Sequence, residues 1–203
     1  MKIGPKYKIA RRLGAPVFEK TQTQKFAIAE ARKGSGKGRG RPRQISDYGL
    51  QLIEKQKARY YYGLSEKQFA NAIKEAQNSQ GDPVDNLFDR LERRLDTVIL
   101  RANFGPSRMF CRQLISHGHL WVDSRKVTVP SYRIKPGQVI SIRPQSLDKG
   151  VFSGFDERLK NAQLPSWIKL DIKERTCQID GRPNRQEMDL LFDLASVMEF
   201  YSR

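Results

Sequence analysis

The stretch SRMFCRQLISHGHLWVDSRKV, residues 107–127, holds the side chains best suited to site chemistry. Cys111, His117 and His119 are the only clustered soft metal ligands in the sequence, and no fourth candidate lies near them. Cys111 falls on the apolar side of its predicted helix, which indicates a buried cysteine rather than a ligand. We therefore predict neither a metal nor a cofactor.

Catalytic patterns are also missing from the sequence. No Ser–His–Asp grouping, paired-carboxylate pocket or nucleotide-binding loop stands out, so we predict no catalytic residue and no enzyme. The run RKGSGKGRGRPR, residues 32–43, fits no phosphate-loop spacing, because Arg39 and Arg41 stand where a closing glycine should be. Its six basic residues and four glycines suit threading along RNA, with a solvated linker as the alternative.

Arginines dominate the helices around this stretch. Five of them belong to one predicted helix pair: Arg90, Arg94, Arg101, Arg108 and Arg112. We expect Arg108 and Arg112 to lie opposite the buried face of their helix, and no acid to partner the five, although Glu92 and Asp96 are near in sequence. Arginine favours phosphate geometry and stacking on bases, so this pattern predicts an RNA-binding surface, with a merely solvated face as the alternative.

The charge distribution supports a polyanionic partner. The 203 residues carry a net charge of +16, concentrated as +12 in residues 1–60 and +7 in residues 91–145. Such segregation favours nucleic acid or an anionic membrane surface. No apolar stretch approaches the roughly 18 residues that span a bilayer, so we expect no membrane partner. The two cysteines, Cys111 and Cys177, are far apart, which favours a reducing compartment.

Hydrophobic periodicity and turn residues predict an α+β fold. Residues 1–45 are expected to form an extended basic arm. Residues 46–90 and 146–203 are expected to form a mainly helical domain with short C-terminal strands. Residues 91–145 are expected to form a module of two helices and a small antiparallel sheet. Its first hairpin would turn at Asp123-Ser124, which are unfavoured turn residues.

Several segments resemble the small-subunit ribosomal protein S4 family. The RNA-binding module of that family is similar to LDTVILRANFGPSRMFCRQLISHGHLWVDSRKVTVPSYRIKPGQVISI. SDYGLQLIEKQKARYYYGLSEKQF resembles the helical region preceding the module, and MEFYSR resembles the family's terminal strand. GPKYKIARRLG is similar to the N-terminus of bacterial and plastid members. The chain departs from some members in lacking an N-terminal cysteine cluster for zinc, and residues 146–163 are unlike most relatives.

The resemblance implies a helical domain with an inserted helix-and-hairpin module, and a structural role without catalysis. A protein of this kind binds the helical junction in the 5′ domain of small-subunit ribosomal RNA and nucleates assembly of the subunit body. It contacts ribosomal protein S5 at an interface that affects decoding accuracy, and helps line the path of messenger RNA into the ribosome. The ribosome would be that of a plastid stroma, with bacterial cytoplasm as the alternative.

The resemblance also implies which residues face ribosomal RNA. Those of the arm and the first helix after it are Arg39, Arg41, Arg43, Tyr48, Lys55, Lys57 and Arg59. Those of the module are Arg94, Arg101, Arg108, Arg112, His117, His119, Arg125 and Lys126. Two rival hypotheses remain: an RNA-modifying enzyme that carries the same module, and a free-standing rescue factor or non-specific RNA binder.

Overall fold

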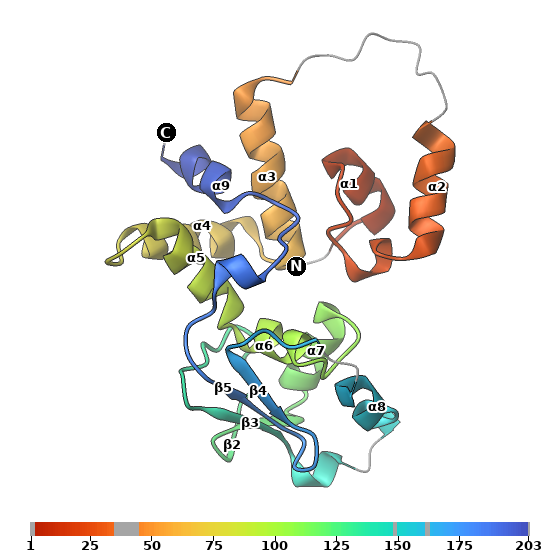
Figure 1. The fold of residues 1–203 in the computed structure, drawn as a ribbon, viewed down its shortest axis with the longest axis vertical. Coiled ribbons are helices and arrows are strands. Elements are labelled where there is room, and N and C mark those ends of the chain that lie inside the picture. The colour runs from red at the N-terminus through yellow and green to blue at the C-terminus, as the bar shows by residue number, and fades with distance from the viewer. Residues whose placement is uncertain (1–2, 35–44, 148–149, 161–162, 203) are drawn as a thin grey trace. The chain divides into compact units, whose positions relative to one another are not determined.

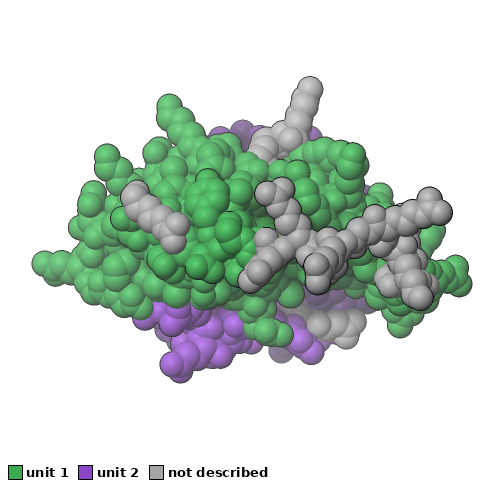
Figure 2. Space-filling model, turned by 90° about the horizontal axis from the view of Figure 1, so that it is seen from above, with its two compact units in different colours: residues 1–84, 189–203 green, residues 85–188 purple. Residues whose placement is uncertain are grey.

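The chain forms two compact units. The structure, a computed structural model, describes residues 3–34, 45–147, 150–160 and 163–202. Residues 1–84 and 189–203 make up the first unit, and residues 85–188 make up the second (Figure 2). The first unit is therefore discontinuous in sequence, and the second is one continuous segment. None of the helices in the described ranges is both long and apolar enough to cross a membrane.

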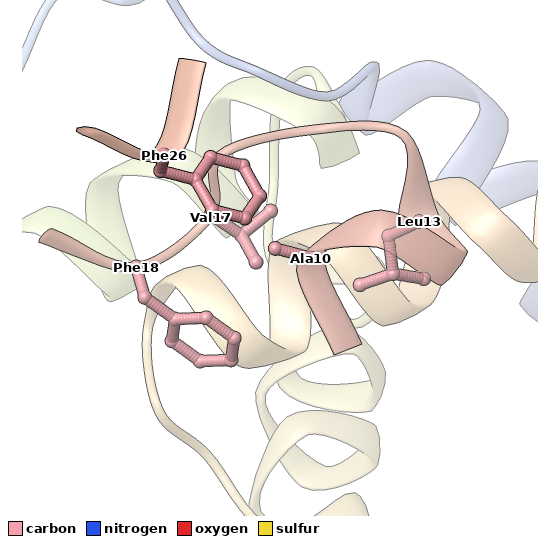
Figure 3. Packing of buried hydrophobic residues seen from close by; sticks show 5 residues of the cluster. All are labelled: Ala10, Leu13, Val17, Phe18 and Phe26. Atoms are coloured by element: carbon pink, nitrogen blue, oxygen red, sulfur yellow. The ribbon is translucent and has the colours of Figure 1, made fainter. Parts of the chain in front are cut away.

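The N-terminal residues fold into helices with a small core of their own. They form α1 (Lys6–Leu13), η1 (Glu19–Thr21) and α2 (Gln24–Gly34) (Figure 1). Their buried side chains, labelled in Figure 3, are Ala10, Leu13, Val17, Phe18 and Phe26. Ile53 and Tyr60, which belong to the next helix, pack against this cluster.

This finding corrects the expected extended arm for residues 3–34. The segment has enough apolar side chains to form helices that bury them against a neighbouring helix. The Gly- and Arg-rich run that motivated the expectation lies almost wholly in residues 35–44, outside the described residues, together with Arg39, Arg41 and Arg43.

Three further helices complete the first unit: α3 (Asp47–Tyr61), α4 (Glu66–Gln77) and α9 (Leu194–Tyr201). Ser65 and Gln68 form the predicted capping box at the start of α4. The expected terminal strand at MEFYSR is wrong, because residues 198–201 of this segment belong to α9. Asp193 begins that helix by accepting hydrogen bonds from the backbone N–H groups of Ala195 and Ser196, at 3.0 and 3.1 Å.

The second unit combines helices with one antiparallel sheet. Its helices are α5 (Pro83–Glu92, which begins at the unit boundary), α6 (Leu95–Arg101), α7 (Arg108–Ser116) and α8 (Phe155–Lys160), with η2 (Pro144–Ser146), η3 (Gly150–Phe152) and η4 (Arg185–Glu187) between elements. Its strands are β1 (Leu120–Val122), β2 (Arg125–Lys126), β3 (Val139–Ile142), β4 (Ile168–Asp171) and β5 (Thr176–Ile179). The strand order is β2-β1-β3-β5-β4. The mixed helical and antiparallel architecture confirms the predicted α+β class.

The sheet extends further along the chain than the sequence suggested. We expected residues 146–203 to return to the helical domain, but residues 146–188 belong to the second unit. Strand β5 pairs with β3, with Ile140 opposite Cys177, and so covers an edge that the predicted module would have left open. In α8, Phe155 packs edge-on against Phe104, with ring centroids 5.0 Å apart.

The β1–β2 hairpin turns at the two residues that the sequence placed there. Asp123 and Ser124 have φ values of 47° and 63°, and positive φ at both central residues is what a type I′ turn requires. The Asp123 carboxylate accepts hydrogen bonds from the Val139 backbone N–H at 2.9 Å and from Gln138 Nε2 at 2.7 Å. These bonds tie the turn to β3 and so hold it in an unfavoured conformation.

Replacing Ser124 by glycine should stabilise the protein. Serine costs free energy in the left-handed region, whereas glycine does not, although glycine also increases the entropy of the unfolded chain. We expect Ser124→Gly to raise the free energy of unfolding by about 0.5–1 kcal/mol, measured by urea denaturation. Asp123→Gly is the control: it relieves the same strain but loses two hydrogen bonds, so it should not stabilise. A destabilising Ser124→Gly would contradict this account of the turn.

Candidate nucleic-acid interface

A buried carboxylate lies at the centre of the arginine-rich helix pair. Asp96, in the first turn of α6, is fully buried. Its two oxygens accept hydrogen bonds from Arg94 Nε and Nη2 at 3.0 and 3.2 Å. Arg112, on α7, donates from Nε to Asp96 Oδ2 at 2.6 Å. One acid therefore holds guanidinium groups from two segments in fixed positions.

A third arginine completes this group, which we call the Asp96 cluster: Arg94, Asp96, Arg108 and Arg112. Arg108 is 5% exposed and donates from Nη1 to Thr97 Oγ1 at 2.8 Å. Burial raises the pKa of Asp96, but attraction from the three arginines and the hydrogen bond from Arg94 outweigh it, so the pKa lies below its ordinary value. The carboxylate therefore stays ionised at neutral pH, and the cluster keeps a surplus of two positive charges.

A second buried acid orders another of the predicted residues. Glu92, at the end of α5, is 1% exposed. It accepts two hydrogen bonds from Arg101, from Nε at 3.0 Å and from Nη2 at 2.9 Å. This pair joins the end of α5 to the end of α6 and is electrically neutral.

These contacts correct two expectations about the arginines. Acids do partner them, because Glu92 and Asp96 are buried beside the apolar stripe of their helices rather than exposed. Arg108 does not point into solvent as its position opposite the apolar face suggested. The functional residues that the sequence analysis missed are these two buried acids. The signal for them was their position, because each directly follows a core leucine, Leu91 or Leu95.

The hairpin and the histidine step lie in the same unit. Arg125 and Lys126 form β2 and are both exposed. His119 is 9% exposed and its Nδ1 lies 3.0 Å from Ser146 Oγ. The ring of His117, which is exposed, has its centroid 5.9 Å from that of His119. Among the described residues, no group of three or more His, Cys, Asp or Glu side chains could hold a metal ion.

The predicted residues of α3 lie in the first unit and are largely engaged within it. Lys55 is 8% exposed, forms an ion pair with Glu66, and lies 4.7 Å from the centroid of the Phe200 ring. Tyr48, which is exposed, packs against the same ring, at 5.4 Å. These contacts attach α9 to α3.

The two other basic residues of α3 also have partners there. Lys57 forms an ion pair with Glu54 at 2.6 Å, and the Arg59 guanidinium lies 4.4 Å from the centroid of the Tyr60 ring. RNA contact by these α3 residues and by the module residues stays a prediction.

Comparison with protein families assigns the architecture. The helices α6 and α7 and the β1–β2 hairpin lie within residues 93–140, which match the family model described as "S4 domain", so the chain is of the S4-domain class. Residues 1–92 match the model described as "Ribosomal protein S4/S9 N-terminal domain".

Curated relatives cover nearly the whole chain, and each is called small ribosomal subunit protein uS4. The relative from Roseiflexus castenholzii is 39% identical over 203 residues, 99% of this chain and 98% of the relative. That from Chloroflexus aurantiacus is 39% identical over 206 residues, 99% and 98% of the two chains. That from Chlorobium phaeovibrioides is 40% identical over 198 residues, 97% and 96%. The chain therefore belongs to the ribosomal protein S4 family and is a structural protein, not an enzyme.

Neutralising the central acid should destabilise the second unit. Asp96→Asn leaves three guanidinium groups around a buried neutral amide, so we expect the free energy of unfolding at about pH 7 to fall by ~3 kcal/mol. Because the pKa of Asp96 is lower in the folded than in the unfolded protein, its contribution is complete above the unfolded pKa. It is lost as the pH falls through the folded pKa, so the difference in stability between the two proteins should be smaller at about pH 3 than at about pH 7.

Urea denaturation at both pH values measures this difference. Asp180→Asn is the control, because Asp180 pairs with Lys169 at an exposed site and should contribute less than about 1 kcal/mol. Equal effects of the two substitutions at about pH 7 would show that the Asp96 cluster does not depend on the buried charge.

Proposed function

We propose that this chain is a primary ribosomal RNA-binding protein of the small ribosomal subunit. It binds the helical junction in the 5′ domain of that RNA and nucleates assembly of the subunit body. The observation that carries the proposal is the Asp96 cluster. In it a buried acid accepts hydrogen bonds from Arg94 and Arg112, while Thr97 accepts one from the neighbouring Arg108. The name that the curated relatives share, small ribosomal subunit protein uS4, supports the placement in that subunit.

The proposed mechanism is electrostatic. Arginines and lysines displace counterions from closely spaced phosphates and so hold the junction in one arrangement. The Asp96 cluster contributes fixed positive charge, because its guanidinium groups are already oriented and lose little freedom on binding. The exposed Arg125 and Lys126 extend this surface at the hairpin, where flexible side chains can follow the RNA backbone. Folded RNA is then recognised by its shape and phosphates rather than by its sequence.

The remaining assignments rest on the family resemblance. We propose that the chain contacts ribosomal protein S5 at an interface that affects decoding accuracy, and that it helps line the path of messenger RNA. The N-terminal RRLG favours a plastid ribosome, whereas the relatives compared above come from bacteria. The same RNA-binding chemistry serves in either ribosome.

Salt-dependent binding separates this function from that of a generic polycation. If six to ten phosphates are neutralised, affinity for 5′-domain RNA should fall by roughly 10³–10⁵ between about 50 and 200 mM salt, by analogy with duplex DNA. A scrambled RNA of equal length is the comparison. We expect a preference for the 5′ domain that persists at the higher salt concentration. Equal affinities and equal salt slopes for the two RNAs would overturn the proposal.

The contribution of the β1–β2 hairpin to RNA binding can be tested without changing a buried side chain. Replacing both Arg125 and Lys126 by alanine should weaken 5′-domain binding and reduce the salt slope by roughly one for each phosphate that the variant no longer neutralises. The matched control replaces Lys169, on β4 at the opposite edge of the same sheet, and Lys173, in the turn between β4 and β5. The control removes the same charge and should bind normally. Equal losses of affinity in the two double variants would show that only net charge matters.

A further inference from the structure

The N-terminal helices line an open hollow that the proposed RNA-binding surface does not use. It has a volume of about 540 Å³ and lies between α1, the turn after it and α2. The apolar part of its lining, which we call its floor, includes Ala10, Ala15, Pro16 and Phe26. Ala10 and Phe26 belong to the small core drawn in Figure 3, so the floor of the hollow is the outer side of that core.

The lining of the hollow also includes a charged pair. Arg11 Nε lies 3.3 Å from Glu30 Oε2, and both residues line the hollow. The Arg11 guanidinium also lies 5.7 Å from the centroid of the Phe26 ring, so it is positioned over the apolar floor. A planar cation and a carboxylate at one edge provide hydrogen-bond donors and acceptors next to apolar surface.

The surrounding segment is strongly basic. Residues 3–34 contain eight lysines and arginines but only two acids, Glu19 and Glu30, and so have a net charge of +6. Such a segment attracts a polyanion and repels a basic protein partner. Of two possible occupants of the hollow, a part of a nucleic acid or an apolar side chain of a basic protein, the charge of the segment favours the nucleic acid.

We propose that this hollow receives one unstacked base of the bound RNA, while the cations around it hold the adjoining phosphates. An apolar slot with a guanidinium group and a carboxylate at its edge suits a flat heterocycle that has both donors and acceptors. A phosphate alone would gain nothing from the apolar floor. This inference rests on the proposed RNA-binding function and adds a base-binding site to it.

The test uses the full chain and small ligands. Each of the four nucleoside 5′-monophosphates is titrated and compared with ribose 5-phosphate, which carries the same charge without a base. Binding is followed by NMR at the methyl groups of Ala10, Ala15 and Ala27, all of which line the hollow. By analogy with base stacking in other RNA-binding proteins, at least one nucleotide should bind about 5- to 150-fold more tightly than ribose 5-phosphate.

Two variants of α2 locate the site. Ala27→Leu places a larger apolar group in the hollow without changing charge, and should abolish the preference for a nucleotide. Ala29→Leu makes the same change on the same helix at a residue that does not line this hollow, and should keep the preference. Circular dichroism checks that both variants keep their helices.

Three results would overturn the inference. They are equal binding of ribose 5-phosphate and nucleotides, shifts confined to residues away from the hollow, and equal loss of preference in both variants. Affinity for 5′-domain RNA, measured on the same preparations, separates this inference from the proposed function. Normal 5′-domain binding without any nucleotide preference would reject the base site alone. Nucleotide binding at the hollow without 5′-domain preference would reject the proposed function alone.

Discussion

Burial of the Asp96 carboxylate is the constraint around which the second unit is organised. A charged group removed from water must be paired, and Asp96 is paired with Arg94 and Arg112 while Arg108 adds further attraction. Its backbone N–H also donates to the Pro130 carbonyl at 3.1 Å. The residue therefore fixes α7 and the loop before β3 against the start of α6. A basic surface that would otherwise repel itself is thereby held in one conformation.

Features with local causes were predictable from the sequence. The capping box at Ser65 depends on residues three apart, and the helix that follows was found correctly. The position of the β1–β2 turn was predictable. Its conformation was not, because it depends on hydrogen bonds that Gln138 and Val139, more than a dozen residues away, donate to the Asp123 carboxylate. The expectation of a strand at MEFYSR came from the family resemblance alone, whereas the local sequence favours a helix, because Asp193 is an N-cap residue followed by apolar residues.

The site was predictable in part. Residue type and resemblance identified the arginines, and the structure brings Arg94, Arg108 and Arg112 together around one acid. The acid itself was missed, because a sequence does not show whether a charged residue next to a core leucine is exposed or buried. The same limit applies to Lys55: its position on α3 suggested an RNA contact, whereas its environment depends on Phe200, which is distant in sequence.

The discontinuity of the first unit determines the order in which the chain can fold during synthesis. The continuous unit, residues 85–188, has all its strands and helices available before α9 is made. The first unit lacks α9 until residues 194–201 emerge, and until then the Tyr48 and Lys55 side chains on α3 lack their aromatic partner Phe200. Since domains generally fold as units during translation, the Asp96 cluster can be in place before the helical unit is complete. The surface proposed to bind RNA is thus complete in a nascent chain whose own synthesis is still in progress.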